Sequence, residues 1–163
     1  MADVIIAIGG NLAHDGAPVK EVLDAAVARF PEHGLKVVKR SALWRSQAWP
    51  DASQPDYLNG VIFAHTGLSA REVLEALLQM EAAFGRRRST PNAPRTLDLD
   101  LIDYGGEIHH EPGLILPHPR AAERRFVMGP LAEISPHWRH PALGQTAAAL
   151  ASRARIGGDA RPV

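Results

Sequence analysis

Two aspartates alternate with leucines in the string RTLDLDLIDYG at residues 95–105. Successive side chains of a strand point to opposite faces, so Asp98 and Asp100 would share one face, with their Cα atoms about 6.6 Å apart. Carboxylates at this spacing can converge on two Mg²⁺ ions, which lie about 3.5–4 Å apart in two-metal phosphoryl-transfer sites. Asp is depleted in strands, so two in one strand favour a functional role over a solvated strand face.

A concentrated positive segment comes directly before these aspartates. Residues 86–95 contain no acidic residue and four arginines, Arg86, Arg87, Arg88 and Arg95. Beside an acidic metal site, such a cluster fits a Mg-nucleotide, because metal ions bridge phosphate oxygens while guanidinium groups cover the remaining charge. The alternative is a solvated basic loop that pairs with nearby acids. Apart from its arginines the segment is small or polar, so we expect it to bury little and to be mobile.

Three further positions could contact a planar ligand. Tyr57 and Asn59 lie two apart on an expected strand, so an aromatic face and an amide would point the same way. Phe126 follows the string ERR in an expected non-helical stretch and could supply a second aromatic face. Taken singly, each of these residues is more often an ordinary core or half-buried residue.

His118 and Glu81 are candidates for contacts to a nucleotide. His118 lies between two prolines that restrict its backbone, and Glu81 lies at the edge of a helical apolar stripe beside the arginine segment. The simpler alternatives are a loop histidine bonded to a carbonyl and an ion pair between Glu81 and Arg88. The chain has no glycine-rich phosphate-binding signature, so arginines, metal and pocket residues would have to hold any nucleotide.

The composition narrows the class of protein. The chain has 163 residues, 45% of them hydrophobic, which is enough for a single domain over residues 1–163. Its formal net charge is zero, which disfavours a general polyanion binder, and it has no cysteine for disulfides or thiolate metal sites. No apolar run approaches the length of a membrane span, and the N-terminus lacks a basic signal-peptide region. We therefore expect a cytoplasmic protein.

The order of elements predicts a ferredoxin-like fold. The expected elements, in chain order, are a strand at 4–8, a helix at 18–30, strands at 35–44 and 57–66, a helix from the Ser69 capping box to Gly85, and a strand at 96–104. This β-α-β-β-α-β order is typical of an α+β domain with an antiparallel sheet and helices packed on it.

A C-terminal extension follows this core on the same domain. It contains a short turn of helix at the string PLAEI and an alanine-rich helix near 145–154. The tail over 157–163 has no anchoring pattern, so we expect it to fray.

Four strings occur in the order IAIGGNL, SQPDYLNGVIFA, APRTLDLDLIDYG and LPHPRAAERRFVMGPL. Over about residues 3–135 the chain resembles the 6-hydroxymethyl-7,8-dihydropterin pyrophosphokinase family. The resemblance implies transfer of pyrophosphate from MgATP to the hydroxymethyl oxygen of a dihydropterin, with release of AMP, in folate biosynthesis. It also implies the ferredoxin-like fold and two Mg²⁺ ions on Asp98 and Asp100. No further enzyme segment is appended, so we expect the stand-alone form and a monomer.

Matching positions carry the other implied roles. The implied ATP contacts are Glu81, Arg88, His118 and Arg124. The implied pterin contacts are Tyr57, Asn59, Phe126 and, through its backbone, Ser46. The implied catalytic loop arginines are Arg86 and Arg95.

The chain departs from the family pattern in its loops. Some members have Arg-Trp-Gly before PRTLDLD, where this chain has the string PNA and a loop one residue shorter. Gly10 stands where Ser is common. A ferredoxin-like RNA-binding module is the rival from another class, but the aspartate pair would repel RNA and the aromatic-and-basic strand motif of such sheets is missing. A homologue that binds its ligands without turnover is the rival among enzymes.

Overall fold

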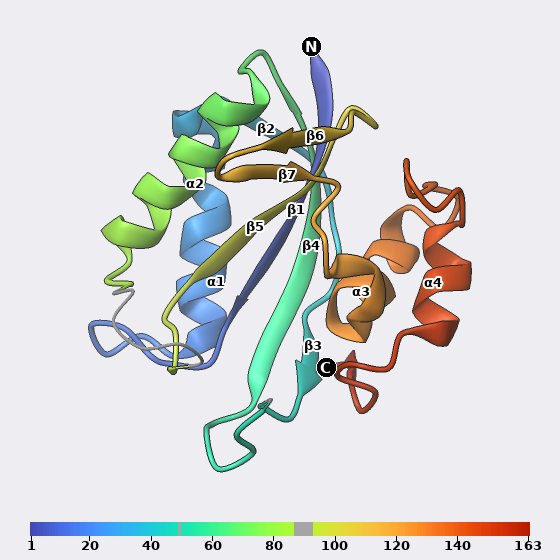
Figure 1. Ribbon diagram of the computed structural model, residues 1–163. Helices are drawn as coiled ribbons and strands as arrows, with labels where there is room; N and C mark the ends of the chain where they lie inside the picture. Colours follow the sequence, from blue (N-terminus) through green and yellow to red (C-terminus); the bar gives the residue numbers. More distant parts are fainter. Residues whose placement is uncertain (49, 87–92) are drawn as a thin grey trace.

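The computed structural model describes residues 1–48, 50–86 and 93–163 as a mixed α/β structure built on an antiparallel sheet (Figure 1). The described strands are β1 (Ala2–Gly10), β2 (Leu35–Arg40), β3 (Trp44–Ser46), β4 (Tyr57–Thr66), β5 (Asp98–Tyr104), β6 (His109–Glu111), β7 (Leu114–Leu116) and β8 (Arg161–Pro162). The described α-helices are α1 (Val19–Ala28), α2 (Ala70–Ala83), α3 (Arg125–Ile134) and α4 (Ala147–Arg153). None of these helices is long and apolar enough to cross a membrane.

The main sheet has the strand order β5-β1-β4-β3-β8, and β2 pairs with β4 as well. β1 is therefore flanked on both sides, and both of its neighbours run antiparallel to it. Its apolar run does not alternate with polar residues, because both faces of the strand are covered. Ile6 and Ile8 belong to one buried cluster, whereas Ile5 and Ala7 belong to the other.

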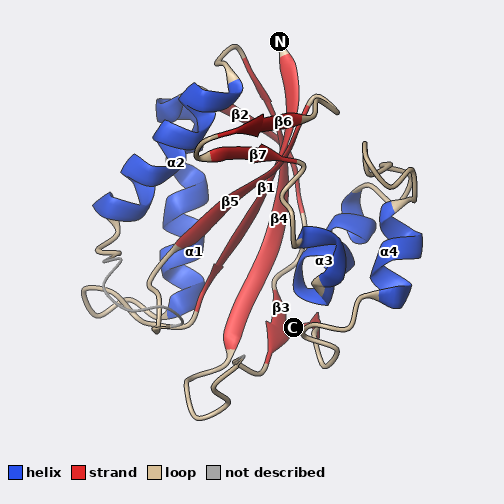
Figure 2. Cartoon of the chain, in the orientation of Figure 1, coloured by secondary structure: helices blue, strands red, loops and turns tan. Residues whose placement is uncertain are grey.

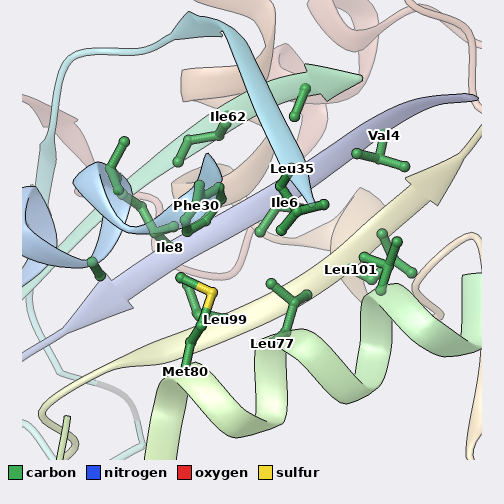
Figure 3. Close-up of a cluster of buried hydrophobic side chains, with 14 of the residues drawn as sticks. Val4, Ile6, Ile8, Phe30, Leu35, Ile62, Leu77, Met80, Leu99 and Leu101 are labelled. Atoms are coloured by element: carbon green, nitrogen blue, oxygen red, sulfur yellow. The ribbon is translucent and has the colours of Figure 1, made fainter. Parts of the chain in front are cut away.

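Helices form a layer on each face of this sheet. α1 and α2 cover one face, and α3 and α4 cover the other (Figure 2). In the first layer, Leu77 and Met80 of α2 pack against Ile6 and Leu99, and Phe30 closes the cluster beside Ile8 (Figure 3). The amphipathic spacing of the apolar residues thus produces two cores separated by the sheet.

β5 carries its leucines and aspartates to different sides. Leu99 and Leu101 belong to the core under α1 and α2, so Asp98 and Asp100 face the side of α3. The register with β1 shifts at a bulge, after which Ile102 enters the α3 core directly next to Leu101. The alternation predicted for the aspartate pair is confirmed, and it ends at the bulge.

Helix α2 begins at the predicted capping box and ends just before the predicted glycine. The backbone N–H of Glu72 donates to the Ser69 hydroxyl at 3.2 Å, and the Ser69 N–H donates back to the Glu72 carboxylate at 2.9 Å. This capping box satisfies two backbone donors that the first helical turn leaves free. Past the other end, Gly85 adopts a left-handed φ of 79°, which stops the helix before the arginine segment.

The predicted strand at 35–44 is wrong in detail, because two shorter strands replace it. β2 and β3 both pair with β4, and the chain leaves the ladder between them. There Ser41 is buried; its N–H donates to the Val61 carbonyl, and its hydroxyl accepts from the Val61 N–H. Glu133 of α3 accepts from the Ala42 N–H at 2.7 Å. A side-chain hydroxyl and a carboxylate from a distant helix replace ladder bonds, which strand propensity alone does not anticipate.

Phe126 lies in the first turn of α3 and not in the non-helical stretch expected for it. The expected short turn at PLAEI is the second half of the same ten-residue helix, which tolerates Pro130 in its interior. The apolar face of α3, with Val127, Met128 and Leu131, is buried in the second core and outweighs the helix-breaking tendency of proline.

The C-terminal tail is paired and does not fray as expected. β8 pairs antiparallel with β3, and the Val163 N–H donates to the Leu43 carbonyl at 2.9 Å. Ala160 is 2% exposed. The tail lacks an apolar pattern because its contacts are mainly hydrogen bonds to other backbone segments.

Replacing Leu99 by Ala tests whether the leucine face of β5 packs in the core while the aspartate face lines the site. Leu99 is 4% exposed, and its truncation should lower the free energy of unfolding by about 2–5 kcal/mol, as for other buried leucines. Ile108→Ala is the control, because Ile108 is 55% exposed and should change stability by less than about 0.5 kcal/mol. Urea unfolding measures both values. Equal effects would mean that Leu99 does not pack in the core.

Candidate active site

A cavity of about 140 Å³ lies on the α3 side of the sheet, where β1, β4 and β5 run side by side. The register sets Asn59 of β4 opposite Gly9 of β1 and Gly9 opposite Asp98 of β5. The next row on the same face places Asp100 opposite Ala7. An amide, a glycine and two carboxylates therefore meet on adjacent strands, although they come from distant parts of the sequence.

Gly9 creates the space for the Asn59 side chain. A Cβ atom at Gly9 would lie 2.2 Å from Asn59 Oδ1 and 3.2 Å from the Leu58 carbonyl oxygen. Any other residue would push the amide out of its position. Sequence reasoning did not assign Gly9 a role, although a glycine at the end of a strand can mark the close approach of another group.

Two arginines bind both oxygens of Asp98. Arg86 Nη1 donates to Oδ1, and Arg95 Nη1 donates to Oδ2 at 3.0 Å. Arg86 Nη1 also donates to Glu81 Oε2 at 2.5 Å. Burial acts to lower the pKa of Arg86, but the carboxylates of Asp98 and Glu81 outweigh it and raise the pKa above its ordinary value.

The side chains of Arg86 and of its partner Glu81 are both largely buried. The Arg86 side chain is 9% exposed, and Glu81 Oε2 also accepts from the Leu99 N–H at 2.8 Å. The expectation that the arginine segment buries little is therefore wrong for Arg86. Helix α2 contributes a carboxylate that anchors both this arginine and the start of β5.

Asp100 is half-buried beside another carboxylate. Its burial, together with the nearby charge of Asp98, raises its pKa to about 7, and the Arg124 guanidinium opposes this shift only in part. A cation between the two aspartates would offset this cost. Mg²⁺ needs only one or two protein carboxylates when water and substrate phosphates complete its shell, so the pair fits that ion. No group of three or more His, Cys, Asp or Glu residues suited to a metal occurs within the described ranges.

Phe126 and Arg124 form the opposite wall of the cavity. The Arg124 guanidinium lies over the Phe126 ring, with Cζ 5.8 Å from the ring centroid. Burial lowers the pKa of Arg124, although the charge of Asp100 opposes this. The guanidinium thus faces an aromatic ring and a carboxylate in the same cavity, an arrangement that suits contact with an anionic ligand.

A second cavity of about 420 Å³ adjoins the first at Asp100. Its walls are mainly aliphatic, with Leu74 and Leu78 from α2 and Ile115 from β7, and His118 lies in its lining. Burial, followed by the positive charge of Arg124, lowers the pKa of His118 to about 4, so its imidazole is neutral at pH 7. The two cavities share Asp100 and differ in character, one mixed polar and aromatic and the other mostly aliphatic.

Asn11 is a second residue that sequence reasoning missed. Its side chain accepts from the Arg95 N–H at 2.9 Å and donates to the Pro55 carbonyl at 3.0 Å. It is 2% exposed, and its own N–H donates to the Arg95 carbonyl. Asn11 therefore fixes the chain at Arg95 against the segment that enters β4. No local sequence signal indicates this role, because both partners are distant in sequence.

The first cavity brings together most of the predicted site residues, namely Ser46, Tyr57, Asn59, Arg95, Asp98, Asp100, Arg124 and Phe126. Arg86 and Glu81 line neither cavity and lie behind Asp98, whereas His118 lies in the second cavity. Arg88, an implied ATP contact, lies outside the described residues.

Comparison with known proteins identifies relatives of this chain. The family model of 7,8-dihydro-6-hydroxymethylpterin-pyrophosphokinase matches residues 5–136. The 2-amino-4-hydroxy-6-hydroxymethyldihydropteridine pyrophosphokinase of Synechocystis sp. is 41% identical over 143 residues, covering 87% of this chain and 71% of that protein. The protein of the same name from Pseudomonas aeruginosa is 38% identical over 138 residues, covering 85% of this chain and 83% of that protein.

The fold is shared with solved structures of longer chains. Wild-type HPPK-DHPS of Plasmodium falciparum has a TM-score of 0.70 over 93% of this chain, at 11% sequence identity. The chain spans 44% of that solved chain, and the likeness at this identity shows the fold alone. The match over residues 5–136 and the relatives at 38–41% identity confirm the resemblance found in the sequence. The chain belongs to the 7,8-dihydro-6-hydroxymethylpterin-pyrophosphokinase family.

Proposed function

We infer that the protein transfers a pyrophosphoryl group from ATP to 6-hydroxymethyl-7,8-dihydropterin in folate biosynthesis, and that it releases AMP. Membership of the family supports the reaction. The observation that carries the assignment of the site is a single cavity that joins two aromatic side chains and an amide to a carboxylate pair and its arginines. Such a cavity has one end for a flat heterocycle and another for phosphates.

The heterocycle end is formed by Tyr57, Phe126 and Asn59. The two rings come from β4 and α3, on opposite sides of the cavity, so they suit the two faces of a pterin. Asn59 offers both a donor and an acceptor to the edge of the ring. Ser46 of β3, opposite Tyr57 in the register, lines the same end.

The second cavity suits the base and ribose of ATP. Its aliphatic walls provide apolar contact for a planar base, and it reaches the first cavity at Asp100. A nucleotide held there would extend its phosphates toward both aspartates and toward Arg124. The neutral imidazole of His118 can donate or accept a hydrogen bond at this junction.

Asp98 and Asp100 would hold Mg²⁺, and the family resemblance implies two ions. When bound, the metal supplies charge neutralisation on the phosphate oxygens and orients them for attack. In the ligand-free chain, Arg86 and Arg95 bind Asp98 and place positive charge beside the two carboxylates. Arg95 lines the cavity and can exchange its bond to Asp98 for one to a phosphate oxygen as negative charge moves toward the leaving AMP. Arg124 lines the same cavity and can add a second bond, whereas Arg86 would first have to leave Asp98 and Glu81.

We also propose that the sheet and its helices form a ferredoxin-like core. Strand order β5-β1-β4, with β2 and β3 beyond β4, supports a ferredoxin-like βαββαβ core in which the broken pair β2–β3 counts as one strand. The monomeric state and the cytoplasmic location stay predictions.

The reaction is tested directly with purified protein, MgATP and hydroxymethyl-dihydropterin. AMP and the pterin diphosphate should form in equal amounts, because the β- and γ-phosphates move together. Mass spectrometry identifies both products. ADP with a monophosphorylated pterin would contradict pyrophosphoryl transfer, and no nucleotide turnover would support a homologue that only binds.

Asp100→Asn should separate activity from stability. The turnover number should fall by roughly 10²-fold or more, because a ligand for the metal at the reacting phosphates is lost. Without metal, the native pKa of about 7 lies above the ordinary value of 3.8, so wild-type stability falls as pH rises from about 4 to 7. The variant avoids this loss and should be more stable at pH 8, by on the order of 2–4 kcal/mol.

Urea unfolding at pH 5 and pH 8 in the presence of a chelator measures the second effect. Glu75→Gln, which removes an exposed carboxylate from α2, is the control and should change neither activity nor the pH profile. A destabilised Asp100→Asn variant at pH 8 would show that ionised Asp100 is well compensated in the metal-free chain.

Arg86→Ala and Arg95→Ala should both impair turnover but differ in stability. Removing Arg86 takes one guanidinium away from the buried Glu81 and should cost about 3 kcal/mol. Arg95 has a side chain that is 30% exposed, and its loss should cost less than about 1 kcal/mol. Thermal unfolding and steady-state kinetics compare the two variants. Equal stability would show that the Glu81–Arg86 pair contributes nothing to the fold.

Arg95→Ala should also bind Mn²⁺ about fivefold more tightly in the absence of nucleotide, because it frees one oxygen of Asp98. Arg120→Ala is the control, since Arg120 lines the same cavity. This substitution removes the same charge, but among the described residues the structure records no hydrogen bond from Arg120 to Asp98 that it would release. Electron paramagnetic resonance measures free Mn²⁺. Equal gains in both variants would indicate a general charge effect.

Gly9→Ala should weaken pterin binding roughly 10-fold, because its Cβ displaces the Asn59 amide and costs a buried hydrogen bond. Gly67→Ala is the matched control, because a Cβ there meets no atom within 4 Å. Calorimetric titration with 6-hydroxymethylpterin measures both. Unchanged affinity in Gly9→Ala would remove Asn59 from the pterin site.

A further inference from the structure

The C-terminal tail reaches the heterocycle end of the cavity, although the family model matches only residues 5–136. Gly157 is part of the cavity lining. It has a left-handed φ of 71°, and a Cβ atom there would lie 2.5 Å from Cδ1 of Phe126. The tail backbone therefore packs directly against the ring that we assign to one face of the pterin.

One end of the tail is fixed to the segment that carries Arg124 and Phe126. The Ile156 N–H donates to the Glu123 carbonyl at 3.0 Å, and the Arg125 N–H donates to the Ile156 carbonyl at 2.8 Å. Arg125 Nε donates to the Ala160 carbonyl at 3.1 Å. These bonds hold the tail against the start of α3 on both sides of Gly157.

The other end is fixed to the opposite rim. Asp159 Oδ2 accepts from the Gln47 N–H at 2.8 Å, and Gln47 lines the cavity beside Ser46. Beyond Asp159, β8 pairs with β3, the strand that ends at Ser46. The tail is thus bonded to both walls between which the heterocycle would lie (Figure 1).

We propose that Gly157 and Asp159 are positioning residues for the pterin. The tail sets the separation between the Phe126 ring and the Ser46–Gln47 rim. Gly157 packs against Cδ1 of the Phe126 ring, and the Asp159 carboxylate holds the rim through the Gln47 N–H. The proposal rests on the assignment of this end of the cavity to the pterin. Within the described residues, the structure records no hydrogen bond from either residue to Asp98, Asp100 or their arginines, so nucleotide binding should be independent of them.

The test uses the full-length chain with two probes, 6-hydroxymethylpterin and a non-hydrolysable ATP analogue with Mg²⁺. Asp159→Ala should raise the Kd for 6-hydroxymethylpterin by about 5- to 10-fold, the effect of one lost charge-assisted hydrogen bond. The Kd of the ATP analogue should change less than twofold. Asp159→Asn keeps an acceptor oxygen and should restore affinity to within about twofold of the wild type.

Gly157→Ala perturbs the same wall from the Phe126 side and should also act on pterin binding alone. Because its φ is strained for Ala, its melting temperature is measured as well. If it does not fold, the two Asp159 variants still decide the matter, since Asp159 is exposed and its substitution changes no buried packing.

Tyr57→Ala distinguishes failure of this proposal from failure of the site assignment. If Tyr57→Ala weakens pterin binding and Asp159→Ala does not, the tail has no positioning role. If Asp159→Ala weakens both probes equally and lowers the melting temperature, the tail is a structural clasp only. If neither Tyr57→Ala nor Phe126→Ala changes pterin affinity, the cavity is not the pterin site and the proposal falls with it.

Discussion

Charge compensation around Asp98 and Asp100 is the constraint on which the site depends. The period of a strand places both carboxylates on one face, and the leucines that alternate with them secure β5 in the opposite core. Burial on that face carries a cost, which appears as the raised pKa of Asp100. Arginines from both ends of the preceding segment meet this cost at Asp98. The ligand-free protein is therefore held together partly by contacts that the proposed metal and substrates would have to replace.

The same constraint explains why positions behind the cavity matter. Glu81 of α2 lines neither cavity, yet it binds Arg86 and the backbone at Leu99. Asn11 acts similarly on the other side by fixing the backbone of Arg95. Each fixes an arginine that we assign to the phosphate end of the site, and each is almost fully buried. Rigid supports outside the cavity hold otherwise flexible arginine side chains in place.

Local sequence patterns predicted the parts of the fold that local physics determines. The alternation of Asp98 and Asp100 with leucines and the Ser69 capping box have short-range causes and were confirmed. The split of the second strand, the helical start at Phe126 and the paired tail depend on partners far away in sequence. Gly9 and Gly157 were missed for the same reason, since a glycine shows its role only when the group packed against it is known.

The raised pKa of Asp100 has a consequence for how the protein exchanges protons with its surroundings. With a pKa of about 7, this carboxyl is roughly half protonated in neutral solution when no cation is bound. A divalent ion requires the ionised form, so its arrival would expel a fraction of a proton into the buffer. The heat of such an association would then depend on the ionisation enthalpy of the buffer and would differ between phosphate and Tris at the same pH.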